Sequence, residues 1–163
     1  MSRNPFLDQP NEPPKQAYEL TLRNTGETFL IDPENLPDDE TDGLEGSVLA
    51  LLLANSIDIY HSCGGVVGCS TCHIYVHSGF DTSPEPIEEE EDQLDFAPAV
   101  QDNSRLACCF VPNGSENVEV EIPAWNRNAV SEDHWVFPCL RKIYRVTLVV
   151  GLISACRLWQ DYL

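Results

Sequence analysis

Basic residues are scarce in this chain of 163 amino acids, which has 9 lysines and arginines against 27 aspartates and glutamates. The formal net charge of −18 repels the phosphates of nucleic acids and anionic lipid headgroups, and it attracts basic protein surfaces. We therefore expect no nucleic acid partner. The charge is uneven, because residues 136–163 carry 4 basic residues and 1 acidic residue. This tail is therefore a different kind of segment from the rest of the chain.

Targeting signals and long apolar runs are also lacking. The first thirty residues show neither a basic region followed by an apolar one nor an arginine-rich amphipathic stretch. The absence of these signals favours a cytoplasmic location, with the mitochondrial matrix as the alternative. The apolar stretch at 146–156 is eleven residues long, whereas a spanning helix needs about 20. We expect no transmembrane span.

The tail at 136–163 leaves two interpretations open. Its basic residues Arg141, Lys142 and Arg145 precede the apolar stretch, which would allow peripheral contact with a membrane surface or packing on a partner. The simpler interpretation is a segment lying against the domain, or an extension without a dedicated role. The role of the tail is unknown on either reading.

The remaining chain divides into a leader and one domain. Residues 1–16 contain four prolines and little apolar content, so they are expected to form a flexible leader. Residues 17–135 hold most of the apolar content, which is enough for one buried core.

Within the domain, local patterns predict an α+β fold. Alternating apolar residues around an Asn24-Thr25-Gly26 turn predict a hairpin at 18–31, and Ser47 is a suitable N-cap for a buried helix at 48–54. Strands are predicted around 74–76 and at 118–122. A short helix is predicted at 88–96, with Leu94 and Ala97 facing inward and the acidic residues at 88–92 and 95 in solvent.

Seven cysteines are present, an odd number, and most of the chemical signal comes from four of them. Cys63, Cys69 and Cys72 form a C-x5-C-x2-C loop, and Cys108 follows in a Ser-Arg-Leu-Ala-Cys segment. Four thiolates are what a 2Fe-2S cluster needs, two for each iron. The glycines between the first two cysteines would let the loop approach such a cluster closely.

Other chemistries remain as alternatives. A structural zinc site also takes four thiolates, and it would make the protein a zinc-stabilised interaction module, but only Cys69 and Cys72 show zinc-knuckle spacing. A dithiol oxidoreductase would leave Cys63 and Cys108 unexplained. A Rieske site needs paired histidines, and none lies near Cys108.

Several residues near the motif have plainer expected roles. His73 is expected to brace the loop by a hydrogen bond, and Arg105 to be a buried ion-pair partner or a plain structural residue. The remaining histidines and cysteines are expected to be structural or surface residues and free thiols: His61, His77, His134, Cys109, Cys139 and Cys156.

The motif set resembles the adrenodoxin-like 2Fe-2S ferredoxins, in particular those that serve iron–sulfur cluster assembly in bacteria and mitochondria. The resemblance covers roughly residues 17–135, through the C-x5-C-x2-C-His run, the acidic stretch at 89–95, the segment at 104–108 and the strand ending at Pro123. Plant-type ferredoxins have four residues between the first two cysteines, and this chain has five.

The resemblance implies a β-grasp fold, with a mixed sheet, one buried helix and a cluster-binding loop. It implies a one-electron carrier and no catalytic residues, with electrons passing from a flavin-dependent ferredoxin reductase to basic acceptor proteins. Iron–sulfur cluster assembly is the implied pathway, and donation to a haem monooxygenase is the alternative. Asp92 and Asp95 match the acidic pair that docks redox partners. The ligands of a single 2Fe-2S cluster are implied at Cys63, Cys69, Cys72 and Cys108, whereas Cys109 matches no ligand and Gly64 replaces a common acidic residue.

Overall fold

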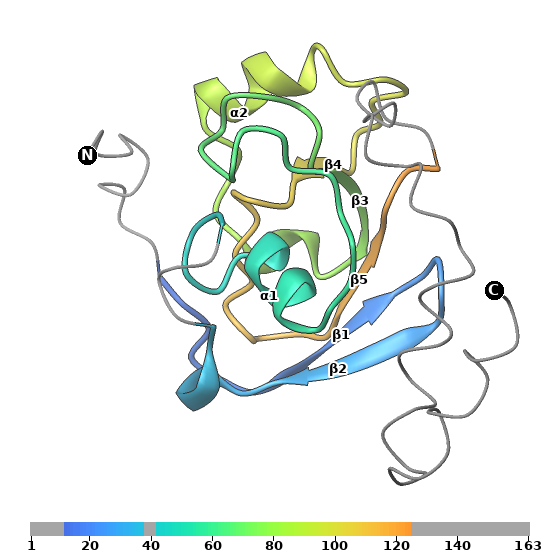
Figure 1. Ribbon diagram of the computed structural model, residues 1–163. Coiled ribbons are helices and arrows are strands. Elements are labelled where there is room, and N and C mark those ends of the chain that lie inside the picture. The colour runs from blue at the N-terminus through green and yellow to red at the C-terminus, as the bar shows by residue number, and fades with distance from the viewer. Residues whose placement is uncertain (1–11, 38–41, 125–163) are drawn as a thin grey trace, which may run out of the picture. The chain divides into compact units, whose positions relative to one another are not determined.

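The computed structural model describes residues 12–37 and 42–124. These residues form a mixed sheet of five strands in the order β2-β1-β5-β3-β4, together with two α-helices (Figure 1). The α+β class predicted from sequence is confirmed. The elements are β1 (Tyr18–Leu22), β2 (Glu27–Ile31), α1 (Val48–Ala54), β3 (His73–Ser78), α2 (Glu88–Leu94), β4 (Ser104–Leu106) and β5 (Val118–Glu121), with short 3-10 turns at Pro33–Asn35 and Phe80–Thr82.

The sheet joins segments that are distant in sequence. The predicted hairpin of β1 and β2 is antiparallel, with Tyr18 opposite Ile31, and β1 also pairs in parallel with β5, with Leu20 opposite Val118. Strand β3 lies between β5 and β4 and is antiparallel to both. The sheet therefore places β4 beside the start of β3.

Helix α1 is the buried helix that the sequence predicted. Its residues are apolar on every side, and the Ser47 hydroxyl accepts a hydrogen bond of 3.3 Å from the Ala50 N–H, which caps the helix start. Residues 48–52 are all buried, and Val48, Leu49, Leu51 and Leu52 belong to one cluster with apolar side chains from the strands. Full burial of each large apolar side chain contributes about 1.5–3 kcal/mol.

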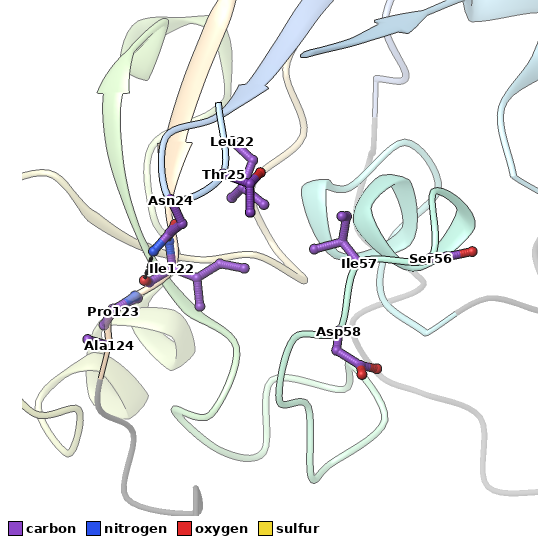
Figure 2. Close-up of a pocket in the computed structure, with 9 residues that line it drawn as sticks. All are labelled: Leu22, Asn24, Thr25, Ser56, Ile57, Asp58, Ile122, Pro123 and Ala124. Carbon is purple, nitrogen blue, oxygen red and sulfur yellow. Dashed lines mark hydrogen bonds between the residues drawn. The ribbon is translucent and has the colours of Figure 1, made fainter. Parts of the chain in front are cut away.

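A shallow hollow of about 390 Å³ lies where the β1–β2 turn, the end of α1 and the end of β5 meet. Figure 2 shows its lining and the Asn24 side chain beside Ile122. Asn24 donates a hydrogen bond of 2.8 Å to the Ile122 carbonyl and accepts one of 2.7 Å from the Ile122 N–H. This pair fixes the β1–β2 turn to the chain beyond β5, and no cysteine lines the hollow.

Helix α2 differs from the sequence prediction in one respect. Leu94 is buried and Ala97 half-buried, as expected, but Glu90 is only 1% exposed, so the prediction that all acidic residues at 88–92 face solvent was wrong. The reason is a buried arginine, Arg105, which lies on β4 beneath the helix. A buried guanidinium requires a carboxylate partner, and Glu90 supplies it.

The last residues assigned to the leader contact the domain. Pro14 is buried, and the Lys15 N–H donates a hydrogen bond of 3.0 Å to the Asn113 carbonyl. Residues 1–11 of the leader, residues 125–135 and the tail at 136–163 lie outside the described residues, and so do His134, Cys139 and Cys156. Among the helices of the described segments, none has the length and apolar character needed to cross a bilayer.

Candidate metal centre

The cysteines of the motif lie on two segments that the sheet brings together. Cys63, Cys69 and Cys72 belong to the loop between α1 and β3, and Cys108 lies in the turn after β4. Pairing of His73 with Leu106 aligns the two segments, and the Ala107 N–H donates a hydrogen bond of 2.9 Å to the Cys72 carbonyl. Cys72 and Cys108, 36 residues apart in sequence, thus have their Sγ atoms 3.5 Å apart.

This sulfur pair suits a shared metal. Around a tetrahedral metal with metal–sulfur bonds of about 2.3 Å, two sulfurs lie about 3.8 Å apart. Cys72 and Cys108 are buried, whereas Cys63 and Cys69 are partly exposed. The motif therefore provides an inner pair and an outer pair of thiols, as two irons with two thiolates each would require.

Sulfur contacts and burial favour the neutral thiol form of the inner pair. The hydrogen bond with Cys108, followed by burial, keeps the pKa of Cys72 well above its usual range. The neighbouring Cys109 thiol and burial raise the pKa of Cys108. Metal binding must therefore displace protons from both sulfurs.

Within residues 12–37 and 42–124, no three histidine, cysteine, aspartate or glutamate side chains converge closely enough to hold a single metal ion. A structural zinc ion needs four donors around one point.

The loop around the cysteines is shaped by a close backbone contact. Gly64 and Gly65 have φ angles of 68° and 75°, which glycine adopts readily. A side chain on Gly65 would overlap the backbone of Gly43, whereas one on Gly64 would meet only Asp42 Oδ1 at 3.6 Å. The Leu44 N–H in turn donates a hydrogen bond of 3.2 Å to the Cys108 carbonyl. Residues 42–44 thus contact both cysteine-bearing segments.

Polar contacts hold the two ends of the loop. His61 Nε2 lies 2.9 Å from Asp42 Oδ2, so the loop start is attached to the same 42–44 segment. Thr71 Oγ1 accepts a hydrogen bond of 2.9 Å from the Ser62 N–H and lies 3.0 Å from Cys69 Sγ. Hydroxyl contacts of this kind affect the charge that a sulfur ligand can carry.

Val67 is a strained residue inside the loop. Its φ angle is 56°, in the left-handed region that β-branched residues rarely adopt, and its side chain is buried in the core. Backbone strain of this kind costs about 1–3 kcal/mol. It persists here because the buried side chain fixes the middle of the loop to the domain.

His73 follows the last loop cysteine and is buried. Its Nε2 atom lies 2.7 Å from Ser104 Oγ on β4, which agrees with the bracing role expected from sequence. Burial lowers the pKa of His73 to about 4, so the imidazole is neutral at physiological pH. His77 is exposed, and its Nε2 atom lies 2.8 Å from Glu121 Oε2.

Sequence reasoning missed the carboxylate that supports the Cys108 segment. Arg105 donates from Nε and Nη2 to Glu90 at 2.8 Å and 3.0 Å, and from Nη1 to the Pro84 carbonyl at 3.0 Å. Glu90 also accepts a hydrogen bond of 2.8 Å from the Leu106 N–H, two residues before Cys108. An arginine within an otherwise apolar segment was the available signal, because its burial demands an acidic partner.

The other acidic residues of the α2 region face solvent. Asp92 and Asp95 are exposed, as are Glu88, Glu89 and Glu91. Phe96 and Val100, just after the helix, are also exposed, at 59% and 48%. The exposed side of α2 is thus an acidic surface with apolar residues at its C-terminal end.

Comparisons with known proteins agree on one relationship. The family model described as a 2Fe-2S iron-sulfur cluster binding domain matches residues 36–113. The mitochondrial Ferredoxin-2 of Danio rerio is 41% identical over 90 residues, which are 54% of this chain and 46% of that protein. This chain therefore spans less than half the length of that relative.

A bacterial relative is covered more fully. The 2Fe-2S ferredoxin of Pseudomonas aeruginosa is 40% identical over 88 residues, which are 54% of this chain and 78% of that protein. Among solved structures, the ISC-like 2Fe-2S ferredoxin FdxB from Pseudomonas putida has a TM-score of 0.54 and 30% identity, covering 71% of this chain and 99% of that one. The predicted β-grasp fold is thereby confirmed.

Proposed function

This chain belongs to the 2Fe-2S ferredoxins and binds one 2Fe-2S cluster, and from this premise we propose that it carries single electrons between protein partners. We propose the cluster ligands at Cys63, Cys69, Cys72 and Cys108. The observation that supports them best is the 3.5 Å approach of the Cys72 and Cys108 sulfurs, which are buried and 36 residues apart. The bound cluster supplies reversible one-electron chemistry.

The residues around the cysteines would control that chemistry without forming or breaking bonds. The inner pair lies in the core, where water is excluded, and the neutral His73 adds no charge beside Cys72. The outer pair, Cys63 and Cys69, lies on the partly exposed side of the loop, where a partner can approach. This arrangement suits an electron carrier rather than an enzyme.

We propose that the partners are a flavin-dependent ferredoxin reductase and basic electron acceptors, docking through Asp92 and Asp95. The exposed acidic side of α2 and the net charge of −18 support this assignment. Exposed charges attract over a Debye length of about 8 Å at physiological salt, so they orient an approaching basic surface.

The pathway that we propose is iron–sulfur cluster assembly. It is supported by the ISC-like description of the Pseudomonas putida neighbour. The relatives named above are bacterial and mitochondrial, so the cytoplasm or the mitochondrial matrix is the proposed compartment.

A direct test uses the full-length chain purified without oxygen. We expect a brown-red protein with two irons and two sulfides per chain and an EPR signal after one-electron reduction. A colourless protein that binds one zinc ion would contradict the assignment. Electron transfer is then measured as the reduction of the purified chain by a catalytic amount of a bacterial ferredoxin reductase.

Docking is tested separately from cluster binding. Asp92→Asn and Asp95→Asn should raise the KM for the reductase and weaken its dependence on ionic strength, because each removes an exposed charge from α2. Glu34→Gln removes one charge from an exposed residue of a 3-10 turn and serves as the matched control. Equal kinetics for all three variants would show that the acidic side of α2 is only a solvated helix surface.

A further inference from the structure

Cys109 is a thiol that the proposed ligand set leaves unused. It follows Cys108 directly, it is partly exposed, and its Sγ atom lies 3.8 Å from Cys108 Sγ. In the resemblance to the adrenodoxin-like ferredoxins, Cys109 matches a position that is not a ligand.

The turn that carries both cysteines is fixed by backbone contacts. The N–H groups of Cys109 and Phe110 both donate to the Leu106 carbonyl at 3.0 Å, and the Leu44 N–H donates to the Cys108 carbonyl at 3.2 Å. Phe110 is fully buried, which anchors the end of the turn in the core. The two neighbouring side chains are therefore held on a rigid turn, where their sulfurs are in contact.

Chemistry decides which sulfur donates once a metal is bound. By position alone, either sulfur of the Cys108–Cys109 pair can be the donor. A cysteine bound to iron is a thiolate without a proton, so it can only accept a hydrogen bond. With Cys108 bound, the remaining S–H donor of the pair is Cys109.

We propose that the Cys109 thiol donates an S–H···S hydrogen bond to Cys108 and thereby raises the reduction potential of the cluster. This inference rests on the proposed function, in which Cys108 is a ligand. Reduction adds one negative charge to the cluster and its sulfurs, and a hydrogen bond to a ligand sulfur stabilises that charge. Cys109 is then a positioning residue that sets the potential and is not itself a ligand.

The test compares the wild-type full-length chain with Cys109→Ala, Cys109→Val and Cys109→Ser. Alanine removes the donor and the volume, valine removes the donor but fills the space, and serine keeps a donor. An S–H hydrogen bond is weak, so we expect alanine and valine to lower the reduction equilibrium constant about threefold, which is about 28 mV for a one-electron couple. Serine should keep the potential at or above the wild-type value.

The potential is measured by a redox titration followed by EPR, after iron and sulfide contents have been matched. A second readout is the magnetic coupling between the reduced cluster and nearby protons that exchange with solvent. One such coupling, from the Cys109 S–H, should be lost in the alanine and valine variants. Equal potentials in all four proteins would overturn the inference, and so would a valine variant that behaves like wild type. Failure of the wild-type chain to bind a cluster would instead overturn the proposed function. Cluster loss in the Cys109 variants, with retention in Cys108→Ser, would show that Cys109 is the ligand.

Discussion

Replacement of Glu90 by glutamine should destabilise the folded domain strongly, although it changes only one atom of the side chain. The Glu90 carboxylate accepts two hydrogen bonds from Arg105 and one from the Leu106 N–H, at 2.8–3.0 Å, and both charged side chains are at most 2% exposed. An amide in its place turns one acceptor into a donor that faces the guanidinium. The arginine charge then remains buried without a counterion.

The expected cost follows from that loss of a partner. Breaking a buried ion pair by removing one side costs about 3–5 kcal/mol. A domain of this size has a total stability of about 5–15 kcal/mol, so the loss is a large fraction of it. The midpoint of thermal unfolding falls by about 4 °C or more for each kcal/mol of stability that is lost, so it should fall by at least about 10 °C in this variant. Circular dichroism and the visible absorbance of the cluster would follow unfolding in parallel.

Two further variants isolate the pair. Glu89→Gln removes the same charge from the exposed side of the same helix and should change stability by less than about 0.5 kcal/mol. Replacement of both Glu90 and Arg105 by leucine removes the buried charges together, and such exchanges are often neutral. The double variant should therefore be more stable than Glu90→Gln. If Glu90→Gln unfolds at the same temperature as Glu89→Gln, the argument for an essential buried carboxylate is refuted.

The remaining predictions concern the cluster and the domain limits. Serine substitution of any single proposed ligand should weaken or abolish cluster binding: Cys63, Cys69, Cys72 or Cys108. The Cys109→Ser variant should retain the cluster, and iron content, sulfide content and the EPR signal measure the difference. Gly65→Ala should reduce cluster content more than Gly64→Ala. Both glycines have positive φ angles, but only a methyl group at position 65 would overlap the Gly43 backbone. Equal cluster content in the two variants would contradict this contact. A chain that ends at Trp135 should remain soluble, brown and reducible, because the proposed ligands all precede Trp135. It should lose any liposome binding that the full chain shows. Failure of the truncated chain to bind iron would place part of the tail in the core.

Local patterns in the sequence predicted those elements that depend on near neighbours. Helix α1 begins after Ser47 as expected, because a run of apolar residues with a capping hydroxyl needs no distant contact to be recognised. The hairpin of β1 and β2 follows from alternation around a glycine turn. The spacing of the cysteines predicted a metal-binding loop because ligand spacing is a local property.

Long-range contacts were beyond the reach of such patterns. Glu90 lies in a run of four glutamates, and nothing in that run distinguishes the one residue that is buried. Strand β4 has only three residues, too few to show an alternation. The packing of Gly43 against Gly65 joins segments more than twenty residues apart, and it depends on backbone geometry alone. These features follow from the tertiary fold.

The parallel pairing of β1 with β5 determines when this domain can fold during synthesis. Strand β5 ends at Glu121, and Asn24 bonds to Ile122 across 98 residues, so the sheet stays incomplete until nearly the whole domain has been made. Cys72 precedes that point by 49 residues, which at about 5–20 residues per second takes roughly 2–10 s. During that time Cys63, Cys69 and Cys72 are part of a chain that does not yet contain β5. The three loop thiols are therefore synthesised before the five-stranded sheet can be completed.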